Sequence, residues 1–228
     1  MNGHKTIAID GPSGAGKSSL ARRTAKHFGF IYVDTGAIYR CVGLAAYRAG
    51  LDTHDAKAVE AILPSLDIRM VYNEAGEQRM ILGGEDVSAE IRLPEISICA
   101  SNVSAHAAVR SFLLEMQRRM ARENDVIMDG RDIGTVVLPY AELKIFLTAS
   151  AEARAQRRML ELQVKGIETS FDEVLKDIEL RDYQDTHRTE APLRRADDAV
   201  LLDTTSLDFE QSFHALCGMI AERFGLSI

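Results

Sequence analysis

The sequence predicts an α/β protein with a five-stranded parallel sheet flanked by helices, and three observations lead to this fold class. Five short apolar runs have the length and composition of buried strands. Helical patterns follow the first four runs, as the crossovers of a parallel sheet require. Three runs end in a carboxylate, and ligands of parallel sheets bind beyond the carboxyl ends of the strands. Asp34 and Asp129 are therefore candidates for a ligand site, whereas Asp203 fits a simple turn cap. The predicted strands are Thr6–Ile9, Ile31–Val33, Val126–Met128, Lys144–Leu147 and Val200–Leu202.

The composition narrows the class of protein further. The 228 residues suffice for one α/β domain with insertions, and a net charge of −7 argues against a broad nucleic-acid-binding face. No apolar run approaches the roughly 18 residues of a membrane span, and the three separated cysteines fit neither a zinc site nor a disulfide framework. The 20 arginines against 7 lysines suit a protein that handles phosphorylated small molecules. We expect a cytoplasmic monomer with small-molecule substrates and no nucleic-acid or membrane partner.

The stretch Gly11–Ser18 lies between the first predicted strand and a helical pattern that ends at Gly29. It fits G-x-x-x-x-G-K-[ST], a loop whose backbone N–H groups converge on phosphate oxygens at a helix N-terminus. Lys17 is expected to reach the β- and γ-phosphates, and the Ser18 hydroxyl to bind Mg²⁺. The sequence therefore predicts a P-loop nucleotide site. Its expected ATP-binding residues are Gly11, Pro12, Ser13, Gly14, Ala15, Gly16, Lys17, Ser18 and Ser19.

About ninety residues separate Asp34 from Asp129, too many for one crossover connection. Within them, 67–72 and 78–82 alternate in polarity around a turn, and this predicts an antiparallel hairpin that is followed by a second turn at 83–86. We interpret residues 37–100 as an inserted subdomain. The core then comprises 1–36 and 101–228.

Two helices in the last third are predicted to form a lid at about 154–188. A charged helical pattern at 151–164 ends before Gly166, and a capping box at Ser170–Glu173 begins a second helix. Helical spacing places arginines on one stripe of each helix, which suits a lid that closes over phosphates. Two solvated helices with ion pairs fit the spacing equally well. The stripes are Arg154, Arg157 and Arg158 on the first helix, and Arg181, Asp185 and Arg188 on the second.

Further clusters follow the second and third predicted strands, at 34–40 and 129–135, on the same side of the sheet as the P-loop. With these clusters the chain resembles the bacterial cytidylate kinases over essentially its whole length. The resemblance rests on strings at 9–17, 83–92, 130–139, 181–182, 188 and 191–193. It implies a P-loop kinase with a nucleoside-monophosphate-binding insertion and a lid. The implied reaction is Mg²⁺-assisted transfer of the γ-phosphoryl group of ATP to CMP or dCMP, in pyrimidine nucleotide metabolism.

The resemblance also implies roles for individual residues. Lys17, Arg131 and Arg188 are the expected catalytic groups, and Ser18 with Asp129 the expected Mg²⁺ site. Many members have Gly-Thr where this chain has Ser18-Ser19, so either serine fits the metal. The lid residues Arg157 and Arg158 are expected to contact the phosphates of ATP. The expected acceptor-binding residues are Thr35, Arg40, Ser101, Arg110, Arg131, Asp132, Arg181, Asp185 and Arg188, with Ser101, Arg110 and Asp132 reading the base.

Three alternatives stay open at this point. Another P-loop kinase could use UMP, AMP or shikimate; the arginines favour a phosphate acceptor, whereas Asp34 could serve as the base for a hydroxyl. A GTPase switch would need an Asn-Lys-x-Asp guanine reader, which the sequence lacks. In a non-catalytic nucleotide sensor, Lys17, the serine hydroxyl that follows it and the arginines would have no catalytic role. Without the resemblance, Ser101 and Arg110 would be interpreted as helix-surface residues.

Overall fold

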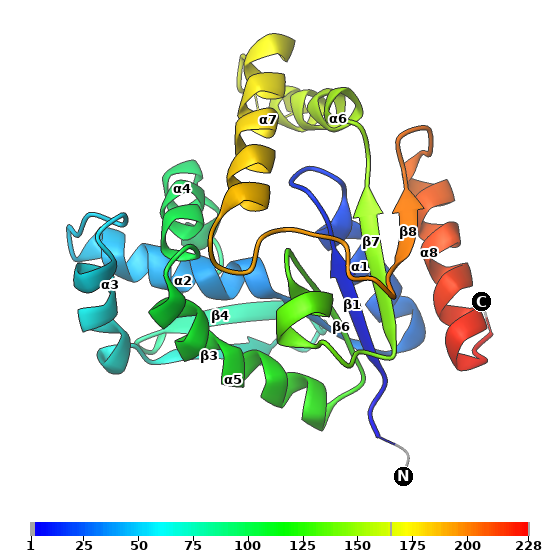
Figure 1. Cartoon of the computed structure of the whole chain (residues 1–228), viewed down its shortest axis with the longest axis horizontal. Coiled ribbons are helices and arrows are strands. Elements are labelled where there is room, and N and C mark those ends of the chain that lie inside the picture. Colours follow the sequence, from blue (N-terminus) through cyan, green and yellow to red (C-terminus); the bar gives the residue numbers. More distant parts are fainter. Residues whose placement is uncertain (1–2, 165, 228) are drawn as a thin grey trace.

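A computed structural model describes residues 3–164 and 166–227, and its centre is a five-stranded parallel sheet in the order β2-β6-β1-β7-β8 (Figure 1). Each of the five predicted strands is confirmed, and every pairing between neighbours is parallel. The central strand β1 immediately precedes the glycine-rich loop, so this loop lies at the middle of the carboxyl edge. The strands are β1 (Thr6–Asp10), β2 (Ile31–Asp34), β6 (Val126–Gly130), β7 (Leu143–Thr148) and β8 (Val200–Asp203).

Helices cover both faces of this sheet, because alternate strand residues point to opposite sides. Ile7 and Ile9 pack with α1 (Lys17–Phe28) and α8 (Phe209–Phe224), whereas Ala8 between them packs towards α5 (Ala107–Glu123). The helix after the glycine-rich loop ends at Gly29 as predicted, with φ of 72°. The predicted fold class of a doubly wound sheet is confirmed.

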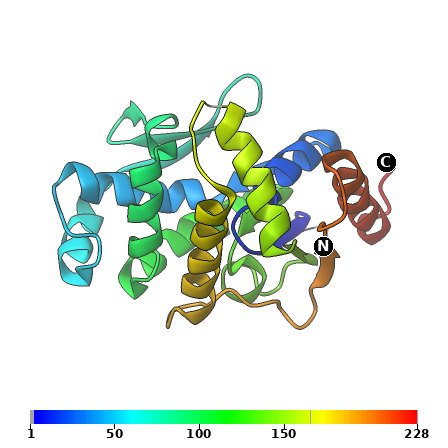
Figure 2. The same ribbon diagram turned by 90° about the horizontal axis from the view of Figure 1, so that it is seen from above.

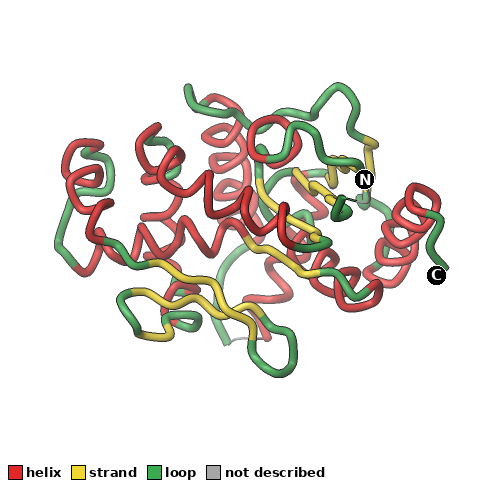
Figure 3. Tube along the Cα trace, turned by 90° about the horizontal axis from the view of Figure 1, so that it is seen from below, coloured by secondary structure: helices red, strands yellow, loops and turns green. Residues whose placement is uncertain are grey.

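The insertion carries a separate three-stranded antiparallel sheet of β3 (Ile68–Tyr72), β4 (Gln78–Leu82) and β5 (Glu85–Asp86). The hairpin is confirmed, but the predicted second turn at 83–86 is shorter: Gly83 and Gly84, at φ of 57° and 90°, make the turn. The two residues after it already pair with β4. The hairpin of β3 and β4 is seen from below in Figure 3.

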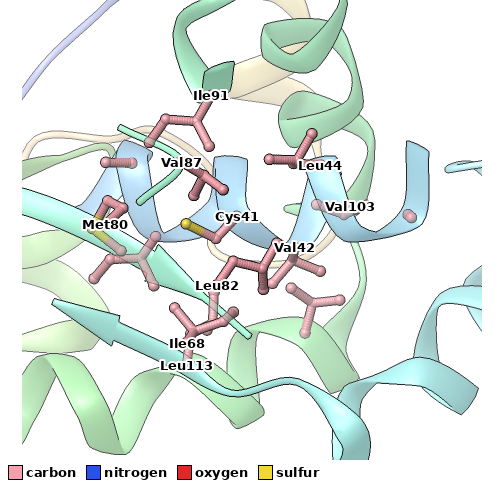
Figure 4. Close-up of a cluster of buried hydrophobic side chains, with 14 of the residues drawn as sticks. Cys41, Val42, Leu44, Ile68, Met80, Leu82, Val87, Ile91, Val103 and Leu113 are labelled. Atoms are coloured by element: carbon pink, nitrogen blue, oxygen red, sulfur yellow. The ribbon is translucent and has the colours of Figure 1, made fainter. Parts of the chain in front are cut away.

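Three helices complete the insertion: α2 (Thr35–Arg48), α3 (Ala56–Ile62) and α4 (Pro94–Val103). Their apolar faces enclose a core with the hairpin, in which Cys41 lies among Met80, Val87 and Leu82 (Figure 4). Gly43 is where α2 and α4 approach closely, because a Cβ there would lie 2.8 Å from the backbone nitrogen of Ala100. The predicted boundaries at 36/37 and 100/101 fall within α2 and α4, and this division of the chain stays a prediction.

Helices α6 (Ala151–Val164) and α7 (Phe171–His187) lie above the carboxyl edge of the main sheet, between the insertion and α8 (Figures 1 and 2). The capping box is confirmed, since Ser170 Oγ accepts from Glu173 N and the Glu173 carboxylate accepts from Ser170 N. A small cluster of Ala155, Val174 and Ile178 joins the two helices. Within the described residues, no helix is long and apolar enough to cross a bilayer.

Candidate active site

The glycine-rich loop has a backbone shape that few residues other than glycine adopt. Gly11 has a φ of 151°, and a Cβ there would lie 1.9 Å from Leu147 O. Gly16, at φ of 87°, precedes α1 without a side-chain cap. The first N–H groups of α1 therefore have no side-chain partner at the cap, which is the usual arrangement for an anion at a helix N-terminus.

Lys17 lies in this loop with its side chain buried. Its Nζ donates to Pro12 O at 2.8 Å. Burial, together with the positive charge of Arg131, lowers the pKa of Lys17 to about 7, although Asp129 and Asp185 oppose the shift. The ammonium group is thus held in a desolvated position, where an additional anion would favour its charged form.

Ser18 and Asp129 come together from α1 and from the end of β6. Ser18 Oγ donates to Asp129 Oδ2 at 2.8 Å, and the Tyr32 hydroxyl donates to Oδ1 at 2.9 Å. Burial and the nearby Asp34 raise the pKa of Asp129. This partly buried hydroxyl–carboxylate pair has the hard oxygen donors that Mg²⁺ prefers, and a cation would relieve the desolvated charge of the buried Asp129. Ser19 is exposed, so the geometry favours Ser18 over Ser19.

Asp132 is buried between two arginines that reach it from distant segments. Arg110 on α5 donates to Asp132 Oδ2, and Arg188, directly after α7, donates to Oδ1 at 3.3 Å. The side chains of Arg110 and Arg188 are only 10% and 9% exposed. Arg188 is fixed further by Nε, which donates to Ala191 O at 2.8 Å. The structure therefore brings three of the predicted acceptor residues into one charged cluster.

Arg131, the neighbour of Asp132, is paired with the lid. Its Nε donates to Asp185 Oδ2 at 2.6 Å and its Nη1 donates to Gly130 O at 3.4 Å, so the plane of the guanidinium group is fixed. The charge of Arg131 also acts on Lys17. Arg131 is thus placed between the glycine-rich loop and the Asp132 cluster.

Both carboxylate oxygens of Asp34 accept hydrogen bonds at the start of α2. Its Oδ1 accepts from Ala37 N at 3.0 Å, and its Oδ2 accepts from Arg92 at 2.7 Å. Burial alone would raise the pKa of Asp34, but Arg92 and Arg40 lower it. A carboxylate held in its ionised form in this way is a weak proton acceptor, which argues against Asp34 as the base for a hydroxyl substrate.

Thr35 and Arg40 lie on the same helix, α2. Thr35 Oγ1 donates to Asp129 O at 2.7 Å, so this hydroxyl supports the strand end. Within the described residues, the buried Nε of Arg40 has no hydrogen-bond partner. Arg40 therefore retains a donor for a ligand.

Four predicted residues are not joined to these clusters by direct contacts. Ser101 is exposed on α4, and Arg181 pairs with Asp177 at 3.1 Å on the outside of α7. Arg157 donates to Thr204 Oγ1 at 3.2 Å, beyond the end of β8, and Arg158 pairs with exposed Glu161 at 3.1 Å. Their roles towards ATP and the acceptor stay predictions.

The sequence placed Arg154 on the predicted phosphate-facing stripe of the lid, but it assigned no role to Asp182, the residue with which Arg154 pairs. Arg154 is buried; it donates to Ser13 O of the glycine-rich loop at 3.0 Å and to both carboxylate oxygens of Asp182 on α7, at 3.0 and 2.6 Å. This bidentate pair fastens the lid helices to the loop. Arg92 was likewise assigned no role, although it lies within one of the strings that carry the family resemblance.

Comparisons with known proteins cover almost the whole chain. A sequence model of the family described as cytidylate kinase matches residues 7–222. A cytidylate kinase from Syntrophotalea carbinolica is 48% identical over 223 residues, which make up 98% of this chain and 94% of that protein. One from Caldicellulosiruptor bescii is 51% identical over 205 residues, 90% of each chain, and one from Geobacter sulfurreducens is 48% identical over 217 residues, 95% and 93% of the two chains.

Proposed function

Because this chain belongs to the cytidylate kinase family, we propose that it transfers the γ-phosphoryl group of ATP to CMP, and to dCMP, forming the diphosphates. The observation that carries the assignment of the site is the buried Asp132 carboxylate between Arg110 and Arg188, next in sequence to Arg131. It supports an acceptor site for a nucleoside monophosphate beside a loop that suits the phosphates of a nucleoside triphosphate.

The donor phosphates lie against the loop Gly11–Ser18, with Lys17 on the β- and γ-phosphates. Ser18 and Asp129 would hold Mg²⁺, and its positive charge would offset the negative charge of the donor phosphates. The 2.8 Å contact between the two side chains supports this pairing. Arg157 and Arg158 reach the donor phosphates when the lid closes.

The acceptor phosphate is clamped by Arg40, Arg131 and Arg188. Its attacking oxygen is already ionised, so the reaction needs alignment and charge neutralisation more than a general base. Asp185 supports this role, because it accepts from Nε of Arg131 and so holds the guanidinium group in one orientation. Thr35 and Arg181 complete the surroundings of the acceptor.

The cytosine ring is read by Asp132, Arg110 and Ser101. Cytosine offers an N4 amino donor to the carboxylate, and its O2 and N3 accept from Arg110 and Ser101. Uracil presents a carbonyl at position 4, which faces the Asp132 carboxylate with like partial charge. Buried polar groups that are paired by one base and left unpaired by another discriminate strongly.

The test is a coupled assay with ATP and a panel of acceptors at equal concentration: CMP, dCMP, UMP, AMP and shikimate. We expect CMP and dCMP to be turned over fastest, with CDP and dCDP as products. Lys17→Met serves as the matched inactive variant. Faster turnover of UMP, AMP or shikimate than of CMP would overturn the proposal. A monomeric state and a cytoplasmic location stay predictions.

A further inference from the structure

Asp10 is a buried carboxylate that the reaction scheme above does not use. It is the last residue of β1, directly before Gly11, and only 5% of it is exposed. Its Oδ1 accepts from Ile133 N and its Oδ2 from Gly134 N, each at 2.7 Å. One side chain therefore joins the strand that carries the donor loop to the backbone of a different segment.

The two amides belong to the π-helical turn Ile133–Val137, which follows immediately on Arg131 and Asp132. In the parallel register of β1 and β6, Asp10 lies opposite Gly130. Gly130 is the residue directly before Arg131. The carboxylate thus accepts the first N–H groups of the turn, where negative charge is favoured. Any shift of these amides displaces the two side chains just before them.

Other side chains hold the far end of the same segment. Arg118 donates to Val136 O and Val137 O, both at 3.0 Å, and Lys144 donates to Pro139 O at 2.6 Å. These contacts fix the segment against α5 and β7. The two bonds of Asp10 instead fix its beginning against the donor loop.

We propose that Asp10 is a positioning residue that sets the Arg131–Asp132 turn at the correct distance from the glycine-rich loop, and so aligns acceptor with donor. This inference rests on the proposed function, because it takes Arg131 as the phosphate clamp and Asp132 as the base reader. Gly134 packs beside this carboxylate, because a Cβ there would lie at a van der Waals distance of 3.4 Å from Asp10 Oδ2, and more tightly, at 3.1 Å, against Lys144 Cδ.

The geometry predicts that loss of this contact affects the acceptor more than ATP. The backbone of Asp10 pairs with β6 on one side and β7 on the other, so the start of the loop keeps its place without the carboxylate. The same β1–β6 pairing ends at Gly130, and beyond it, within the described residues, the Asp10 carboxylate makes the only side-chain hydrogen bonds from β1 or the glycine-rich loop to residues 131–134.

Asp10→Asn is the test, because the amide keeps the size of the side chain but turns an NH₂ group towards one of two backbone N–H donors. We expect the KM for CMP to rise and the kcat/KM preference for CMP over UMP to fall, each about tenfold, while the Kd of ATP by calorimetry changes less than about twofold. Asp203→Asn, at the end of β8, where the carboxylate accepts from Thr205, is the matched control and leaves all three values unchanged.

Every outcome of these measurements either supports or overturns the proposed role of Asp10. A folded Asp10→Asn enzyme with an unchanged KM for CMP and unchanged base preference overturns the proposal, and so does an equal loss for ATP and CMP. If Asp10→Asn does not fold, Asp10→Glu keeps the carboxylate but lengthens the side chain by one methylene group, which displaces the turn and is expected to give the same selective loss. If the wild type prefers another acceptor, the proposed function fails, and the comparison is made with that acceptor instead.

Discussion

Replacing Asp132 by alanine removes the carboxylate that neutralises two buried arginines. Asp132 is only 4% exposed, and its partners Arg110 and Arg188 are nearly as well buried. Breaking a buried ion pair on one side costs about 3–5 kcal/mol, because the remaining charge is left desolvated and unpaired. Asp132→Ala should therefore lower the free energy of unfolding by that amount, which is a factor of at least about 10² in the folding equilibrium.

Urea unfolding without nucleotide measures this loss, and steady-state kinetics on the same protein measures its effect on the substrates. We expect the KM for CMP to rise and the KM for ATP to stay nearly constant. Asp132→Asn, which keeps the shape of the side chain, separates lost volume from lost charge and should resemble alanine in its effect on CMP.

A loss below about 1 kcal/mol would show that Arg110 and Arg188 are solvated and not held by Asp132, since exposed pairs contribute no more than this. If ATP binding weakened instead and the preference for CMP survived, Asp132 would not be the base reader.

Three further changes test other parts of the structure. Gly43→Ala gains about 1 kcal/mol of helix propensity, but its Cβ would lie 2.8 Å from the backbone nitrogen of Ala100. Urea unfolding should therefore show a net decrease of about 1–3 kcal/mol in the free energy of unfolding. A net increase would contradict the close packing of α2 on α4. Burial lowers the pKa of Lys17 from its ordinary 10.5 to about 7, so between these two pH values the native state binds fewer protons than the unfolded state and the free energy of unfolding rises with pH. This contribution, at most about 1.4 kcal/mol per pH unit, should be absent in Lys17→Met without nucleotide, and equal slopes for the two proteins would refute it. Arg188→Ala should lower kcat more than it raises the KM for ATP; an effect confined to ATP binding would place Arg188 on the donor side.

Local patterns account for the parts of the fold that the sequence predicted well. The strands, the loop at Gly11–Ser18, the hairpin and the capping box at Ser170 each depend on residues close together in the chain. Glu85–Asp86 was missed as a strand because two residues carry no periodicity, and they pair only because Gly83 and Gly84 turn the chain back onto β4.

The candidate site was predicted less completely, because its contacts join distant segments. Arg110, Asp132 and Arg188 were assigned through a family resemblance, and no spacing rule brings them together. Arg154 and Arg158 do share a stripe on α6, but only the first turn of that helix passes the glycine-rich loop. Arg154 is therefore buried against Ser13, whereas Arg158, one turn later, is exposed. The carboxylate of Asp10 gave no signal, since its partners are backbone amides of residues 133 and 134.

The central claim is that a buried carboxylate between two arginines selects cytosine beside a P-loop donor site. The ratio of kcat/KM for CMP to that for UMP, with saturating ATP and Mg²⁺, tests it most directly. We predict a ratio on the order of 10⁴ in favour of CMP, as expected of a site whose buried polar groups only one base can satisfy. A ratio near one would contradict the claim.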